Sequence, residues 1–285
     1  MDLELIAGLP PWEWPEGTGD LLLSIIRDAG AAESDRVLAA ELAGDVTVIS
    51  DELVEVLLSI IRSRGESEEL RGAAAGALGP VSELADMDGF EFPDSVPVSE
   101  RVFEETRASL RKLYMDADAP KGVRRRILEA SVRAPQDWHP QAVRGAVESG
   151  DQEWKLTAVF CMRYVPGFDE EILEALDSRE RDIHYQAVRA AGAREVNAAW
   201  PYIARLAKSA PTDKPLLLAA IEAVATIRPA EAPRVLADLL HHKDKDIREA
   251  AGEALDMARA LERLGDEDLD GEFDDDEDDD DGYRG

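Results

Sequence analysis

The stretch of sequence that decides the fold reads DIREAAGEAL, from Asp246 to Leu255. Ile247 is followed, at offsets of three, four, seven and eight, by Ala250, Ala251, Ala254 and Leu255. Those offsets place all five side chains on one face of a helix. Because alanine is small, a second helix can approach this face closely. The stretch therefore predicts a helix-packing surface.

The same pattern recurs upstream, where an apolar anchor residue precedes small side chains at helical spacing. The anchors are Val37, Leu70, Val123, Trp154, Ile183, Leu216 and Ile247. Most neighbouring anchors are one helix pair apart, roughly 30 residues, and about 20 extra residues between Leu70 and Val123 indicate an insertion. The repetition predicts an all-α, right-handed α-solenoid of about seven helix pairs over residues 20–261, because a single helix pair cannot bury its own apolar face.

Two phrases carry a family resemblance: Asp246-Ile247-Arg248 with Ala250-Ala251, and Asp182-Ile183-His184 with Ala187. In them the chain resembles the HEAT repeat proteins, in particular the shorter, Ala-rich bacterial kind also seen in phycobilisome-lyase-like proteins. The resemblance implies stacked helix pairs. It also implies that the polar residues just after the anchors are structural and pair with carboxylates of neighbouring repeats. These residues are Arg71, Arg124, Lys155, His184 and Arg248.

The end and the insertion of the repeat array each have two interpretations. Residues 1–19 contain Trp12 and Trp14 among prolines, and we expect them to cap the open end of the array. The alternative is a Pro- and Trp-rich ligand for a partner domain. The inserted loop, residues 80–98, carries Phe90 and Phe92 and is either a tolerated surface loop or a binding loop.

Charge limits the classes of partner. The formal net charge is −30, and 13 acidic residues with one arginine follow Gly265. Such a field repels nucleic acid and anionic membranes and favours a basic protein partner. Residues 262–285 are expected to be a disordered acidic tail.

Location is predicted from the cysteine count and the N-terminus. The single cysteine, Cys161, excludes an intrachain disulfide and fits a reducing cytoplasm. The N-terminal stretch has no basic region with a long apolar run, so no secretory signal is expected, and no segment is long enough to span a bilayer.

A basic island interrupts the acidic chain over residues 101–144, with ten basic and six acidic residues. It includes the run Arg124-Arg125-Arg126. The island has three interpretations: a docking patch for an acidic partner or phosphate, a site for the acidic tail, or a set of structural ion pairs. The structural interpretation is favoured about as much as the other two together.

The tail contains a match to a calcium-binding loop. Oxygen ligands at loop positions 1, 3, 5, 9 and 12, with Gly271 at the sharp turn, follow the EF-hand pattern. The ligands are Asp266, Asp268, Asp270, Asp274 and Glu277. The outgoing helix of an EF-hand is missing, so loose binding of divalent ions is favoured over a specific Ca²⁺ site.

The sequence offers little enzyme chemistry. None of the four histidines, His139, His184, His241 and His242, is followed by Glu, and one cysteine cannot complete a zinc site. No Gly-rich phosphate loop is present. We therefore expect a non-enzymatic scaffold for protein–protein interaction. The alternatives are an adaptor regulated by the acidic tail or by calcium and, with less weight, a lyase-like protein that handles a small molecule or chromophore.

The expected binding surface is the concave face, which the anchored second helices line. Its candidate contacts are Arg124, Arg125, Lys155, His184, Tyr185 and Arg248. The sequence identifies neither the partner nor the oligomeric state.

Overall fold

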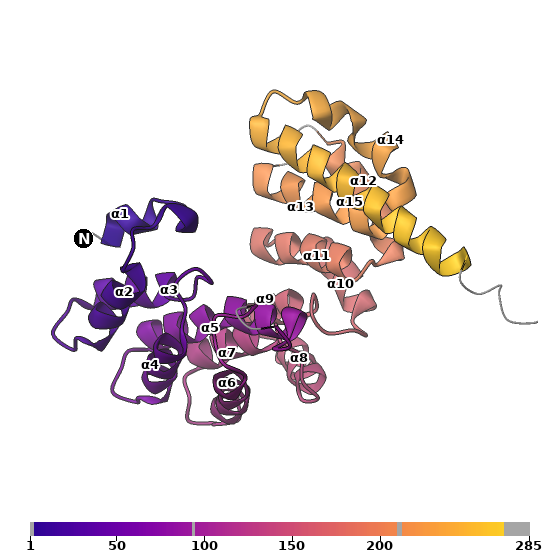
Figure 1. The fold of residues 1–285 in the computed structure, drawn as a ribbon. Helices are drawn as coiled ribbons and strands as arrows, with labels where there is room; N and C mark the ends of the chain where they lie inside the picture. The colour runs from indigo at the N-terminus through magenta and orange to yellow at the C-terminus, as the bar shows by residue number, and fades with distance from the viewer. Residues whose placement is uncertain (1–2, 93–94, 210–212, 271–285) are drawn as a thin grey trace, which may run out of the picture. The chain divides into compact units, whose positions relative to one another are not determined.

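The computed structural model describes residues 3–92, 95–209 and 213–270, which form helices, turns and no strand. The predicted all-α class is therefore confirmed. The chain divides into two compact units, residues 1–167 and 168–285 (Figure 1). Within the described ranges, no helix is both long enough and apolar enough to cross a membrane.

The first unit holds one short N-terminal helix and four helix pairs. They are α1 (Leu3–Ala7), the pair α2 (Thr18–Arg27) and α3 (Glu33–Leu42), the pair α4 (Asp51–Arg62) and α5 (Glu68–Asp88), the pair α6 (Glu100–Tyr114) and α7 (Lys121–Ser131), and the pair α8 (His139–Glu148) and α9 (Gln152–Cys161).

The second unit holds three pairs, and the first helix of its last pair is split. They are α10 (Asp169–Leu176) with α11 (Arg181–Ala193), α12 (Trp200–Ala207) with α13 (Lys214–Ile227), and α14 (Ala232–Leu236), continued by the 3-10 helix η4 (Ala237–His241), with α15 (Lys245–Asp270).

The second helices of successive pairs stack on one another within each unit. In the first unit α3 packs on α5, α5 on α7 and α7 on α9; in the second unit α11 packs on α13 and α13 on α15. Each second helix also packs on the first helix of its own pair. This arrangement confirms the predicted helical-repeat fold, with seven helix pairs in the described part of the chain.

Several helix starts follow from capping side chains. A Ser or Asp before the helix accepts a hydrogen bond from the free backbone N–H two or three residues later, which satisfies one of the unpaired N–H groups at the helix start. These caps are Ser50 for α4, Ser67 for α5, Ser99 for α6, Asp151 for α9 and Asp213 for α13.

An arginine at one repeat position anchors each of the second helices α3, α5 and α7 to the end of the preceding helix. The side chains of Arg36, Arg71 and Arg124 each donate to the backbone carbonyl ten residues upstream. Arg36 also forms a bidentate pair with Glu66, at 2.8 Å for both contacts. The first repeat is therefore aligned through Arg36. The predicted anchor Val37 is wrong because the anchor position directly precedes the arginine, as Leu70 and Val123 do, and in the first repeat this residue is Asp35.

The insertion starts later than the sequence predicted. Helix α5 continues through Pro80 to Asp88, so residues 80–88 are helical and the connecting segment begins at Gly89. Phe90 packs against Phe103, with ring centroids 5.5 Å apart, and only Phe92 is exposed. The helix tolerates Pro80 because a proline costs an internal hydrogen bond but need not end a helix that packs on neighbours.

The aromatic pair Trp138-His139 is part of the core. His139 is fully buried and stacks on Trp138, with ring centroids 3.9 Å apart. Its Nδ1 accepts from the backbone N–H of Gln136, so its Nε2 carries the proton and donates to the Ser131 hydroxyl. Burial lowers the pKa of His139 to about 4, and the imidazole is neutral at pH 7.

Candidate functional site

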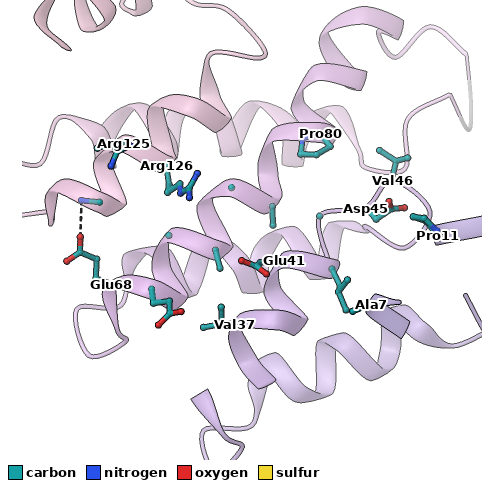
Figure 2. Close-up of a pocket in the computed structure, with 18 of the residues that line it drawn as sticks. Ala7, Pro11, Val37, Glu41, Asp45, Val46, Glu68, Pro80, Arg125 and Arg126 are labelled. Atoms are coloured by element: carbon teal, nitrogen blue, oxygen red, sulfur yellow. Dashed lines mark hydrogen bonds between the residues drawn. The ribbon is translucent and has the colours of Figure 1, made fainter. Parts of the chain in front are cut away.

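The first unit contains a groove of about 950 Å³ over its stacked second helices. Helix α5 forms the floor, α3 and α7 contribute the two sides, and residues 7–14 close one end. Figure 2 shows Val37 and Glu41 of α3 on one side of α5 and Arg125 and Arg126 of α7 on the other.

The floor of the groove is made of small residues. Gly72, Ala73, Gly76, Ala77 and Pro80 line it, and they recur at helical spacing along one face of α5. Because these residues have small side chains or none, this face lets the backbone of a ligand approach closely at Gly76. Pro80 has no N–H group, so it cannot donate the usual helical hydrogen bond to the carbonyl of Gly76, four residues earlier.

Four carboxylates line the same groove: Glu41, Asp45, Glu68 and Glu69. None of them forms an ion pair with a cation in the described part of the chain. Asp45 accepts from the backbone and side chain of Thr47, and Glu68 accepts from the backbone N–H of Gly122 at 2.9 Å. These contacts orient the two carboxylates without neutralising them, and Glu41 and Glu69 have no described polar contact.

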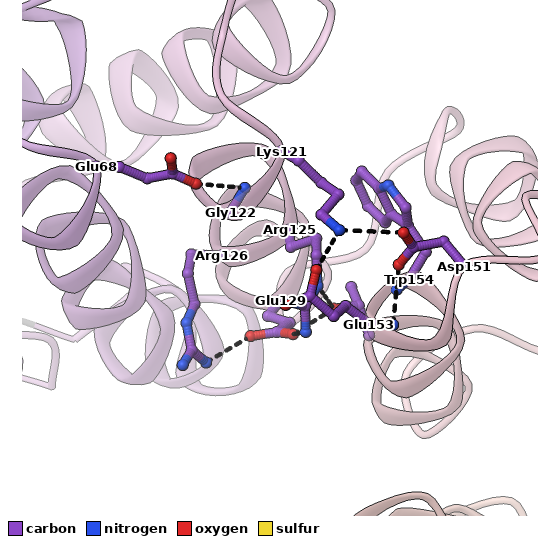
Figure 3. Close-up of polar contacts among 10 residues, drawn as sticks. Glu68, Lys121, Gly122, Arg125, Arg126, Glu129, Asp151, Glu153 and Trp154 are labelled. Carbon is purple, nitrogen blue, oxygen red and sulfur yellow. Dashed lines mark hydrogen bonds and ion pairs between the residues drawn. The ribbon is translucent and has the colours of Figure 1, made fainter.

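The two cations of the groove are already paired. Arg125 contacts Glu129, Glu153 and the hydroxyl of Thr157, and Arg126 pairs with Glu129 at 2.9 Å (Figure 3). The groove is therefore negative in net effect, because its cations are compensated and its carboxylates are not.

A ladder of charges joins the starts of neighbouring second helices. Lys121 at the start of α7 contacts Asp151 and Glu153 at the start of α9 (Figure 3). Its hydrogen bonds hold the pKa values of both carboxyl groups below their ordinary range and raise the pKa of Lys121. In the second unit, Lys214 of α13 bridges to Asp244 and Asp246 beside α15 in the same way.

Of the residues predicted to line the concave face, some line a groove and others hold neighbouring helices together. Arg125 lines the groove just described, and Tyr185 lines a second groove on the other unit. Arg124 packs over the rings of Tyr114 and Trp154 as well as donating to the Tyr114 carbonyl. Its role is to join helices.

The remaining three predicted contacts also lie among neighbouring side chains. Arg248 donates to the carbonyls of His242 and Lys243. His184 hydrogen-bonds to the Tyr202 hydroxyl at 2.7 Å, and burial lowers its pKa. Lys155 is half-buried on α9.

The basic island supplies its own acidic partners. Arg101, Arg107, Arg111 and Arg133 each form an ion pair with a carboxylate of the same unit, in addition to the pairs of Lys121, Arg125 and Arg126. Most of its positive charge is thus compensated in the described structure. This favours the structural interpretation of the island.

Only part of the predicted calcium loop lies in the described chain. Helix α15 runs through Asp270, so Asp266, Asp268 and Asp270 have helical backbone. Asp274 and Glu277 lie outside the described residues. In the part of the chain that the structure describes, no cluster of three or more His, Cys, Asp or Glu could hold a metal ion.

Sequence reasoning missed the carboxylates Glu41 and Glu69 and the floor of the groove. The floor carried a signal: the run RGAAAGALGP, residues 71–80, spaces Gly72, Gly76 and Pro80 by four within an otherwise Ala-rich helix. Its meaning depends on neighbouring helices that leave this face open, and the order of residues in α5 does not reveal that.

Comparison with known proteins shows similarity in fold only. No protein-family model and no curated protein matches the chain. Three solved structures are similar to it. YibA of E. coli has 13% identity and a TM-score of 0.44, covering 86% of this chain and 84% of YibA.

An engineered protein has 18% identity and a TM-score of 0.35, covering 86% of this chain and 98% of its own. Human deoxyhypusine hydroxylase, in complex with glycerol, has 15% identity and a TM-score of 0.40, covering 90% of this chain and 88% of its own.

The predicted function is corrected by the last of these structures. We expected a non-enzymatic interaction scaffold, but human deoxyhypusine hydroxylase is by name an enzyme. The helical-repeat fold therefore gives no ground for assigning a scaffold, and function has to be argued from individual sites.

Proposed function

We propose that the first unit binds a cationic peptide segment of a partner protein in the groove over α3, α5 and α7. The observation that carries this proposal is the set of uncompensated carboxylates, above all Glu41 and Glu69, around a floor of small residues. Lys or Arg side chains of a ligand would supply the missing positive charge, and the ligand backbone would lie against the exposed Gly76.

The dimensions of the floor define the ligand. From Glu69 to Pro80 the floor helix rises about 16 Å, which an extended peptide of about five residues spans. The net charge of −30 further supports a basic partner and argues against nucleic acid and anionic membranes as ligands.

Two finer assignments are proposed on the sequence alone. The Ala-rich phrases support membership in the shorter, bacterial HEAT-like group, and the single buried cysteine, Cys161, supports a reducing, cytoplasmic location.

Binding is tested by fluorescence anisotropy with a labelled peptide of alternating Lys and Ala. We expect the double variant Glu41→Gln/Glu69→Gln to weaken binding about ten-fold at low salt, because two charge-assisted contacts of about 0.7 kcal/mol each are lost. The charge-matched control is Glu100→Gln/Glu148→Gln, which changes two exposed carboxylates outside the groove. If both double variants weaken binding equally, attraction is general and the groove is not the site.

A second variant fills the groove without using charge. A Cβ atom at Gly76 would meet nothing within 4 Å, so Gly76→Leu is accommodated and adds helix propensity. We expect the melting temperature to hold or rise and peptide affinity to fall more than ten-fold, since the side chain occupies the floor. Gly145→Leu, on an exposed face of α8 with equally open space, is the matched control and should leave affinity unchanged.

A further inference from the structure

The second unit contains its own groove of about 780 Å³ over α11, α13 and α15. Its floor differs from that of the first groove because larger apolar side chains line it. Leu218 of α13 is half-buried, and Met257 of α15 is 43% exposed, with Ala250 and Ala254 beside it. Methionine is flexible and polarisable, so it adapts to the apolar side chains of a ligand.

Carboxylates follow one edge of this floor. Asp246, Glu249 and Glu253 are spaced by three and four residues, so they lie on one stripe of α15, and Glu222 of α13 joins them. Lys214 compensates Asp246, and the exposed Lys245 pairs with Glu249 at 3.3 Å. Glu222 and Glu253 have no ion pair in the described chain, and an exposed pair such as Lys245–Glu249 is easily exchanged for another cation.

The opposite edge of the groove has a different character. Arg189 of α11 packs over the ring of Tyr185, with its guanidinium carbon 5.9 Å from the ring centroid. Positive charge thus lies on the α11 side and uncompensated negative charge on the α13 and α15 side. A ligand that satisfies both edges carries its cations along one side only.

We propose that this groove binds an amphipathic helix of a partner protein, with apolar side chains on the floor and Lys or Arg along the edge that faces α15. From Asp246 to Met257 the floor is about 16 Å long, which corresponds to about three turns of a bound helix. Apolar anchors on one helical face, flanked by basic residues, are the pattern that an apolar groove with an acidic edge recognises. This site is separate from the first groove, where the floor offers no apolar side chain of comparable size.

The test uses the full chain and three synthetic peptides of about 14 residues. The first is a Leu/Lys peptide with helical apolar spacing, the second has the same composition in an order that destroys the apolar face, and the third replaces Lys with Glu. We expect the first to bind and to gain helicity by circular dichroism, and the other two to bind at least ten-fold more weakly. Equal binding of the first two peptides, or binding without a gain in helicity, would overturn the proposal.

Variants locate the site. We expect Met257→Ser to weaken binding of the amphipathic peptide about five-fold and Glu249→Gln/Glu253→Gln about five- to ten-fold. Glu170→Gln/Asp238→Asn removes the same charge from exposed positions elsewhere in the unit and should have less than a two-fold effect. Equal effects of the two double variants would contradict the assignment.

Two further measurements distinguish binding in this groove from binding in the first groove and from self-association of the chain. Gly76→Leu, which fills the first groove, should leave binding of the amphipathic helix unchanged, so failure at one groove does not imply failure at the other. Sedimentation velocity of the free chain should show a concentration-independent monomer. Self-association that Met257→Ser abolishes would show that a second copy of the chain occupies the groove, and would overturn the proposal.

Discussion

Replacing Gly44 with alanine should destabilise the first unit by about 3 kcal/mol, because the added methyl group has no space. A Cβ atom at this position would lie 2.5 Å from the carbonyl oxygen and 2.6 Å from the Cα of Ala77. Both are backbone atoms of α5, so the clash is relieved only by moving the turn that follows α3, which contains Gly44, away from α5. Urea unfolding followed by circular dichroism measures the effect as a lower midpoint.

Two glycines serve as comparisons for this prediction. At Gly192 an added Cβ would lie 2.9 Å from both the Cα and Cβ of Ala223, so Gly192→Ala should destabilise the second unit by a similar mechanism. At Gly145 there is open space, and Gly145→Ala should stabilise its helix by about 0.5–1 kcal/mol. If all three substitutions behave alike, helix propensity rather than close helix packing controls these positions.

Acidification should destabilise the first unit through His139. The pKa of this buried imidazole is about 4 in the folded chain, against an ordinary value of 6.5. Between these values the unfolded chain binds the proton more readily than the folded chain, so the free energy of unfolding falls as the pH falls. The contribution of the neutral His139 to the free energy of unfolding is fully present above pH 6.5. About 3 kcal/mol of this contribution is lost by pH 4.

The measurement compares the pH dependence of two proteins. Unfolding free energies of the native chain and of His139→Phe/Ser131→Ala are determined between pH 7 and pH 4. The double variant keeps an aromatic ring and leaves no unpaired hydroxyl at residue 131, but it cannot titrate. We expect its stability to depend less steeply on pH, while the effect of protonating carboxylates is shared by both proteins. Parallel curves would show that His139 does not control the acid response.

The alanine pattern predicted the fold well because packing between repeats is local in sequence. Most of the small residues after Ile183 and Ile247 are buried where second helices meet, as their spacing required, whereas Ala250 is half-buried and lines the second groove. The first repeat was misaligned by two positions because Val37 is apolar and Asp35 is not, whereas Arg36 makes the contacts that define the repeat. A buried arginine with a carboxylate partner 30 residues away cannot be recognised from hydrophobic periodicity.

The site was harder to predict because it consists of what the neighbouring helices leave uncovered. The sequence placed Arg124 and Arg125 together on the concave face, yet Arg124 is held by Tyr114 and only Arg125 lines the groove. Adjacent helix positions point about 100° apart, so one of them is expected to face the preceding helix. Which of the many carboxylates lack cations depends on contacts across repeats, and these exist only in the folded chain.

The ladder formed by Lys121 and Lys214 has a kinetic consequence. Each of these lysines contacts acids about one repeat, 30 residues, further along the chain. Such contacts close loops of only one repeat, so the chain loses little conformational entropy before these interactions form. We therefore expect folding to nucleate at any helix pair and to extend to its neighbours, and we expect each unit to unfold first at its ends.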